Sequence, residues 1–129
     1  MQLAVPAGFY DVQAIEEREG RVVNIRWANR LVVMPYPDER GHHLEVINFK
    51  NGFGALQVRG GAGPPPEVAL YESTKRHKPV AAPFTGESYI LFIVPAAIYD
   101  LRVRSGDRVT WQNGIEVPLD RTRLSVIEQ

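Results

Sequence analysis

The sequence VPAAIYDLRV at residues 94–103 decides the fold class of this chain. Within it, the apolar Tyr99, Leu101 and Val103 alternate with polar residues, so every second side chain points to the same side of an extended backbone. Alternation of this kind is typical of a β-strand with one buried face and one face toward water. The stretch therefore predicts a half-buried strand that follows Pro95.

Similar patterns occur through most of the chain. Further short strands are expected at residues 10–14, 23–27, 44–46, 56–58, 68–70, 115–117 and 124–126. The turn residues between strands are Glu19-Gly20, Asn51-Gly52, Ser105-Gly106-Asp107 and Asn113-Gly114. No window places apolar residues at helical spacing over a long proline-free stretch, so no helix is expected. The sequence predicts an all-β fold, either an antiparallel β-sandwich or a partly closed barrel.

The composition limits the function classes. With 129 residues, the chain has the usual length of one domain and can bury a sufficient core. Its 15 basic and 15 acidic side chains balance, which argues against a nucleic-acid or membrane-surface partner. The absence of cysteine excludes disulfides, thiolate zinc sites, iron–sulfur clusters and cysteine nucleophiles.

The N-terminal residues and the hydropathy bear on location. Residues 1–6 contain no basic leader, and the most apolar run, residues 89–97, is too short to span a bilayer. We therefore expect a cytoplasmic protein, with a removed export signal as the alternative.

Three blocks of similar sequence occur in the same order in two parts of the chain. They are VPAGFYDV (5–12) and VPAAIYDL (94–101), WANRLVV (27–33) and WQNGIEV (111–117), and LEVI (44–47) and LSVI (124–127). We expect one β domain, residues 1–129, with repeat units 5–47 and 94–127 joined by strands and loops in 48–93. Each unit alone could not bury its apolar face, so the two are expected to close on a shared core with approximate two-fold symmetry.

The repeat also fixes the expected interior. Trp27 and Trp111 are expected to occupy equivalent, equally buried places. The full set of expected core residues is Tyr10, Val12, Val23, Ile25, Trp27, Val33, Val46, Tyr99, Leu101, Val103, Trp111, Val117 and Val126. Because a sheet of this type leaves free edges, a homo-oligomer formed by edge pairing is also expected.

The second copy resembles a known family. Residues 94–103, followed by GIEV (114–117) and TRLSV (122–126), are similar to the closing half of carboxypeptidase-regulatory-like and transthyretin-like β-sandwich modules. The resemblance covers about the last third of the chain and, more faintly, the first quarter. Ala97 stands where those modules carry a glycine. The resemblance implies a non-catalytic sandwich used in adhesion, assembly or support of a neighbour, and it carries no active-site residue.

Asp11 and Asp100 hold the same position in the two copies, next to Tyr10 and Tyr99. Strand alternation places both carboxylates on the outward face. A matched pair of carboxylates could indicate catalysis, but turn capping or a cross-strand ion pair is the expected role. Each tyrosine is expected to bury its ring and to find a partner for its hydroxyl.

Two charged segments are candidates for contact with a partner protein. They contain Lys75, Arg76, His77 and Lys78 in one segment, and Asp38, Glu39, His42 and His43 in the other. Adjacent histidines on a strand point to opposite faces, so the second segment does not predict a metal site. No catalytic, cofactor-binding or metal-binding residue, and no cofactor, is predicted.

Three function classes follow from these observations. The first is a non-catalytic protein-interaction or assembly module. The second is a small inhibitor or immunity-type protein that presents one of the charged segments to a partner enzyme. The third is a small enzyme or ligand binder, whose pocket would join residues from distant strands. The lack of a catalytic constellation favours the first class, with a protein partner and neither nucleic acid nor membrane.

Overall fold

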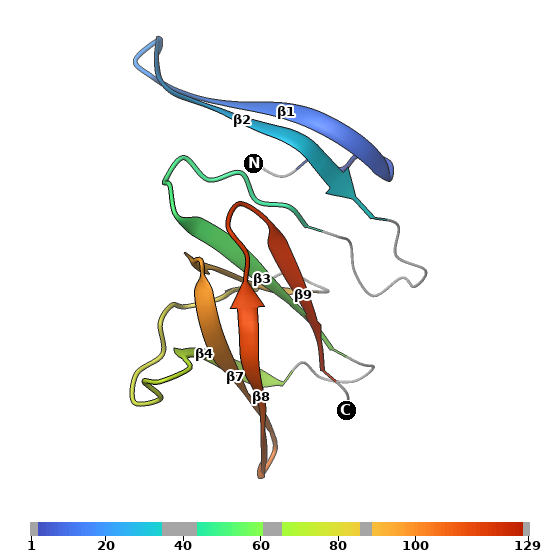
Figure 1. Ribbon diagram of the computed structural model, residues 1–129, viewed down its shortest axis with the longest axis vertical. Coiled ribbons are helices and arrows are strands. Elements are labelled where there is room, and N and C mark those ends of the chain that lie inside the picture. The colour runs from blue at the N-terminus through green and yellow to red at the C-terminus, as the bar shows by residue number, and fades with distance from the viewer. Residues whose placement is uncertain (1–2, 35–43, 61–65, 86–88, 128–129) are drawn as a thin grey trace.

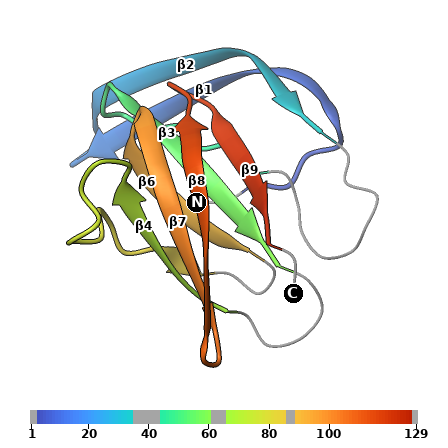
Figure 2. The same cartoon turned by 60° about the horizontal axis from the view of Figure 1, so that its bottom comes forward.

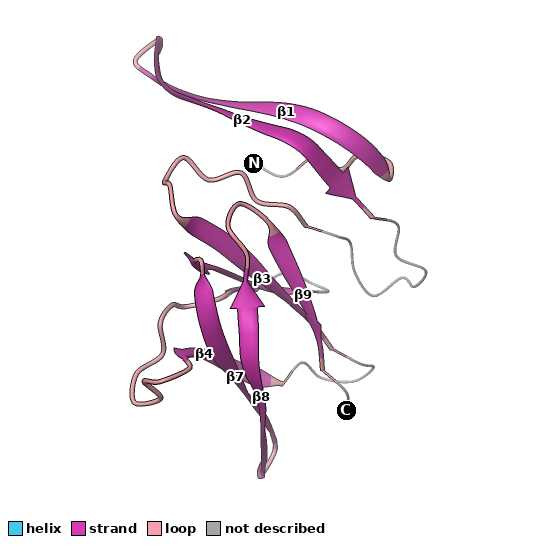
Figure 3. Cartoon of the chain, viewed as in Figure 1, coloured by secondary structure: helices cyan, strands magenta, loops and turns pink. Residues whose placement is uncertain are grey.

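The computed structural model describes residues 3–34, 44–60, 66–85 and 89–127. Its elements are all β-strands, which confirms the predicted all-β class (Figure 3). The strands are β1 (Gly8–Arg18), β2 (Arg21–Val33), β3 (Phe53–Arg59), β4 (Glu67–Glu72), β5 (Phe84–Thr85), β6 (Ile90–Pro95), β7 (Ala97–Ser105), β8 (Arg108–Val117) and β9 (Thr122–Val126).

The strands form three sheets. One sheet has the order β5-β6-β3-β9, the second has the order β4-β7-β8, and the third is the hairpin β1-β2. All neighbours are antiparallel except β3 and β9, which pair in parallel. The two larger sheets pack together as a sandwich and do not close into a barrel (Figure 1).

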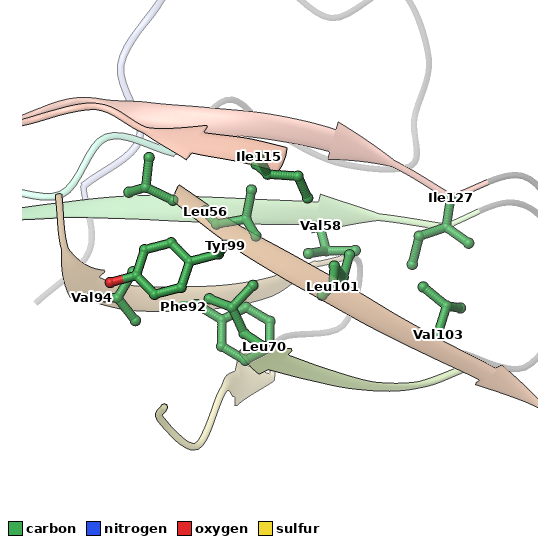
Figure 4. Close-up of a cluster of buried hydrophobic side chains, with 11 residues drawn as sticks. Leu56, Val58, Leu70, Phe92, Val94, Tyr99, Leu101, Val103, Ile115 and Ile127 are labelled. Carbon is green, nitrogen blue, oxygen red and sulfur yellow. The ribbon is translucent and has the colours of Figure 1, made fainter. Parts of the chain in front are cut away.

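The core lies between the two larger sheets. Leu56 and Phe92 are cross-strand partners in one sheet, and Leu70 and Leu101 are partners in the other. All four side chains are fully buried, and Figure 4 shows them directed into the same interior. Burial of one such side chain contributes roughly 1.5–3 kcal/mol. Packing of these side chains between the two sheets therefore contributes several kcal/mol to the stability of the sandwich.

The central strand β3 also carries a close backbone contact. A Cβ atom added at Gly54 would lie 1.9 Å from the carbonyl oxygen of Pro118. Only glycine permits this approach, which brings the β8–β9 connection across β3. The adjacent Asp120 N–H donates to the Phe53 carbonyl, and the Ala55 N–H donates to that of Arg121.

The hairpin β1–β2 lies across one end of the sandwich (Figure 2). Its two-residue turn, Glu19-Gly20, has φ angles of 53° and 77°, as the type I′ turn of a tight hairpin requires. One face of the hairpin lies toward the sandwich, where the Arg26 guanidinium donates to Asn51 Oδ1 at 3.1 Å and pairs with Asp120.

The expected core is confirmed at four positions of the second repeat unit, but it is wrong at Trp111 and Val126 of that unit and throughout the first. Tyr99, Leu101, Val103 and Val117 are buried, whereas Tyr10, Val12, Val33, Val46 and Trp111 are half-buried and Val23, Ile25, Trp27 and Val126 are exposed. The expected shared core does not form: Leu31 is the only buried apolar residue of unit 5–47 within the described residues, and it lies outside the core cluster. The reason is that β1–β2 remains a separate sheet whose outer face no described segment covers.

Three local expectations also change. Residues 44–46 are not a strand, and Asn113-Gly114 lies within β8 instead of at a turn. The apolar run at residues 89–97 contains β6, which had not been expected as a strand.

Candidate functional site

A buried carboxylate is the chemical centre of the β4-β7-β8 sheet. Asp100 is 3% exposed, so the expectation of a carboxylate open to solvent is wrong. The β7–β8 register shifts between Tyr99 and Leu101, which leaves Asp100 in a β-bulge. Gly114, at φ 68°, donates its N–H to Asp100 Oδ1 at 3.0 Å. The expected turn-capping role is therefore replaced by a hydrogen bond to the backbone of the neighbouring strand β8.

Arg76 neutralises this carboxylate. Its Nε–H donates to Asp100 Oδ2 at 2.9 Å, and its Nη2 lies 2.8 Å from the same oxygen. Nη2 also donates to Asn113 Oδ1 at 2.6 Å. The Ser73 hydroxyl donates to Asp100 Oδ1 at 3.1 Å. Residues from the turn after β4 and from β7–β8 are thereby fixed to one another.

Aromatic rings complete the site. The Arg76 Cζ lies 4.2 Å from the centroid of the Trp111 ring, within cation–π distance. The Tyr71 ring lies 5.5 Å from that of Trp111 at an interplanar angle of 50°. We call Tyr71, Arg76, Asp100, Trp111 and Asn113 the arginine clasp: a guanidinium held by a carboxylate, an amide oxygen and an indole.

The surroundings set the pKa of Asp100. Burial by itself raises the pKa of this carboxyl, but the Gly114 N–H, Arg76 and Ser73 donate hydrogen bonds to the charged form, and the charge of Arg76 also favours it. The second group of effects is larger, so the pKa of Asp100 lies below its ordinary value. The carboxylate is charged at neutral pH and serves as a fixed anion.

The hydrogen bonds of the arginine clasp hold side chains from separate segments in place. The Ser73 hydroxyl donates directly to the carboxylate, and among the described residues no imidazole is hydrogen-bonded to the clasp. Within the described residues, no group of three or more histidine, aspartate or glutamate side chains is placed to hold a metal ion.

Two hydrogen bonds found beside the clasp in the hairpin β7–β8 have counterparts in the hairpin β1–β2. The Tyr10 hydroxyl donates to the Pro6 carbonyl, and the Tyr99 hydroxyl donates to the Pro95 carbonyl at 2.6 Å. Both tyrosines thus reach the proline four residues earlier. Their expected hydroxyl partners are present in both hairpins.

The aspartates are equivalent as well. Arg30, at φ 56°, donates its N–H to Asp11 Oδ1 at 2.9 Å, just as Gly114 does to Asp100. The register around Asp11 shifts in the same way, because Tyr10 pairs with Leu31 and Val12 pairs with Ala28.

This shared register places the other clasp positions. Trp27 corresponds to Trp111, and Asn29 corresponds to Asn113. The predicted equal burial of the two tryptophans is nevertheless wrong, because Trp27 is 56% exposed and Trp111 is half-buried. The difference comes from the covering groups: Tyr71 and Arg76 lie on Trp111, and no described residue takes their place on Trp27. Duplication of the whole units 5–47 and 94–127 stays a prediction.

The residues of the basic segment that was expected to contact a partner have different surroundings. Arg76 is engaged in the clasp, whereas Lys75, His77 and Lys78 are exposed, with Lys75 Nζ 3.8 Å from Glu72. Partner contact by these residues stays a prediction. The other expected contact residues, Asp38, Glu39, His42 and His43, lie outside the described residues.

Sequence reasoning missed the clasp as a unit. It identified Arg76 as part of a basic run and Asp100 as a repeated carboxylate, but it did not connect them. No sequence pattern indicated that Tyr71, Ser73 and Asn113 would lie beside Arg76 and Asp100. The repeated aspartate was the only sequence feature that led to the site.

Within the described part of the chain, no helix has the length and apolar character needed to cross a membrane. Comparison of the chain with protein-family models, curated proteins and solved structures gives no match.

Proposed function

We propose that this protein is a non-catalytic protein-interaction or assembly module that binds its partner through the outer face of the hairpin β1–β2. One observation carries the proposal: the outer face of this hairpin exposes several large apolar side chains. Ile15 and Ile25 are cross-strand partners that are 50% and 57% exposed, and the neighbouring Trp27 is 56% exposed. Phe9, at the start of β1, is 81% exposed.

The outer face of the hairpin exposes large apolar side chains beside a charged residue that faces inward. Arg26 lies on the face toward the sandwich, with its side chain 19% exposed, while the flanking Ile25 and Trp27 point away. Contiguous exposed apolar side chains on a soluble domain are typical of a contact surface. Tryptophan is also among the residues that contribute most to protein interfaces.

The edges of the hairpin support the same proposal. β1 pairs with β2 on one side, and no described strand pairs with its other edge. The equivalent edge of β7 is occupied by β4. An unpaired edge beside an apolar face can accept a strand from another chain.

A comparison of variants tests this function. The full chain, immobilised, is used for capture from native lysate alongside the double variant Ile25→Ser/Trp27→Ser. Sedimentation of the free proteins measures self-association. Val109→Ser is the matched control, because Val109 holds the position equivalent to Ile25 on β8 and is 49% exposed.

We expect the double variant to lose a stoichiometric partner, or a concentration-dependent oligomer, that the control retains. Identical capture and identical sedimentation for all three proteins would contradict the proposal.

A further inference from the structure

Resting on the proposed interaction function, we propose that the hairpin β1–β2 binds an arginine side chain of a partner polypeptide, carried by an extended segment that pairs with the free edge of β1. The arginine clasp on β7–β8 is the template. The two hairpins share this local geometry: β7–β8 has its arginine and its neighbouring strand in place, whereas no arginine or strand among the described residues occupies the equivalent place on β1–β2.

The acceptor atoms correspond one by one. In the occupied clasp, Asp100 Oδ1 accepts the Gly114 N–H while Oδ2 accepts the guanidinium of Arg76. In β1–β2, Asp11 Oδ1 accepts the Arg30 N–H, and no described side chain donates to its Oδ2. One carboxylate oxygen is therefore fixed by the backbone in both hairpins, and in β1–β2 the other is available for a guanidinium.

The remaining groups of the clasp have counterparts too. Asn29 holds the position of Asn113, whose side-chain oxygen accepts from Arg76, and Trp27 holds the position of Trp111, over which that guanidinium lies. A carboxylate, an amide oxygen and an indole recognise a guanidinium better than an ammonium, because its planar donors and flat face use all three.

Charge complementarity defines the same ligand. Asp11 and Asn29 are exposed, and in the described residues no arginine or lysine pairs with Asp11. Asp100, in contrast, is buried under its cation. An arginine placed over Trp27 would give Asp11 the cation that Asp100 already has.

The strand that carries the arginine is defined by the pairing of β4 with β7. Tyr71 pairs with Asp100, and Arg76 follows five positions later in the adjoining turn. The equivalent segment on β1 would pair across Tyr10 to Ile15, place an aromatic ring on Trp27, and bring an arginine over Asp11. The ligand is thus an extended segment with an aromatic residue followed, after four residues, by an arginine.

We assign the segment to a different polypeptide, because the β4 strand of a second copy is already paired with β7 and packed in the core of that copy. Leu70 of β4 is fully buried in the core and Tyr71 is 5% exposed. Removing β4 from one copy to serve another would expose this interior. The occupant is therefore an aromatic and arginine strand of a partner.

A synthetic peptide with the sequence of residues 67–78, EVALYESTKRHK, is the probe. It is titrated to about 1 mM, a concentration that reveals weak binding, into the full 15N-labelled chain, and amide and indole resonances are followed by NMR. We expect saturable shifts of the Arg30 amide and the Trp27 indole N–H. Asp11→Asn is expected to weaken binding about tenfold, in line with the loss of hydrogen bonds to a charged group. Arg76→Gln in the peptide is expected to do the same.

The control variant is Asp107→Asn, an exposed aspartate at the tip of β7–β8, which should leave the affinity unchanged. No shift at Trp27 and Arg30, shifts confined to Trp111 and Gly114, or equal affinity for wild type and Asp11→Asn would each overturn the inference. A Trp27 shift that depends on protein concentration without peptide would also overturn it, in favour of a second copy as the occupant. If the peptide fails while Ile25→Ser/Trp27→Ser still loses its partner in the capture experiment, only this inference fails and the proposed function stands.

Discussion

The guanidinium of Arg76 lies 4.2 Å from the ring centroid of Trp111 while it donates to the buried carboxylate of Asp100. One side chain thereby fixes the turn after β4 to the hairpin β7–β8. Because the carboxylate has no other cationic partner among the described residues, the pair contributes to stability chiefly by avoiding an unneutralised buried charge.

Arg76→Ala should therefore destabilise the fold. We expect the free energy of unfolding to fall by about 2 kcal/mol, less than for a fully buried pair because the Arg76 side chain is 43% exposed. Urea unfolding followed by circular dichroism measures the change. Lys75→Ala is the control, since its ion pair with Glu72 is exposed and should contribute less than about 0.5 kcal/mol. Equal effects of the two substitutions would contradict the role of the clasp.

The pKa of Asp100 predicts a pH dependence. Since this pKa is lower in the folded protein than its ordinary value of 3.8, the charged carboxylate stabilises the fold above about pH 4. That stability is lost as the pH falls through the folded-state pKa. Asp100→Asn should be less stable at neutral pH, by about 2 kcal/mol, and should show a shallower loss of stability below pH 4.

Unfolding by urea at a series of acidic pH values tests this dependence, with Asp107→Asn as the exposed control. Parallel pH profiles for the two variants would show that Asp100 does not contribute to acid sensitivity.

Gly54 should tolerate no side chain. Its Cβ would meet the Pro118 carbonyl oxygen at 1.9 Å, and because that atom belongs to the backbone it cannot move aside cheaply. We expect Gly54→Ala to destabilise by about 3 kcal/mol or more, the upper range for overpacking. Gly60→Ala is the matched control, with its nearest atom 3.9 Å away. Thermal unfolding compares them, and a Gly54→Ala protein that melts with wild type would show that the β8–β9 connection shifts freely.

The two tyrosine-to-proline hydrogen bonds should differ in strength. Tyr99 is 2% exposed, so Tyr99→Phe leaves the Pro95 carbonyl short of a donor and should cost about 1 kcal/mol. Tyr10→Phe should cost clearly less, because water can replace the hydroxyl at the more exposed hairpin. Paired denaturation curves measure both. A larger cost at Tyr10 would mean that β1–β2 is covered more completely in solution.

Trp27 offers a spectroscopic check of its exposure. In a Trp111→Phe variant, Trp27 is the only tryptophan and is 56% exposed, so its fluorescence should be readily quenched by iodide. The reciprocal Trp27→Phe variant reports Trp111, whose ring is covered by Arg76 and Tyr71, and it should be quenched less. Equal quenching would contradict the difference between the two hairpins.

The sequence predicts strands well where burial selects one face. The alternation of Tyr99, Leu101 and Val103 is confirmed because their common face packs into the core. The same alternation at Ile25 and Trp27 indicates that these side chains share one face of a strand. It does not indicate whether another part of the protein covers that face. This is why the fold class was predictable while the exposure of β1–β2 was not.

The site was predictable only in part, for a related reason. The repeated aspartate is a local feature that the sequence shows, but its acceptance of a backbone N–H from the neighbouring strand at a β-bulge is not the turn capping that was expected. The contact between Arg76 and Asp100, in contrast, depends on the pairing of β4 with β7. These strands are distant in sequence, so no local sequence pattern predicts their pairing. The parallel placement of β9 beside β3 is hidden for the same reason.

That parallel pair has a consequence for how the chain acquires its structure. Ala55 lies beside Thr122, so the edge of β3 stays open until a segment far along the polypeptide arrives. Contacts between such distant segments require closure of a long loop. The conformational entropy lost on closure is offset only after the segments bury apolar surface, and this slows folding. Until β9 arrives, this edge of β3 has unpaired backbone groups, so we expect aggregation to compete with folding chiefly before this step.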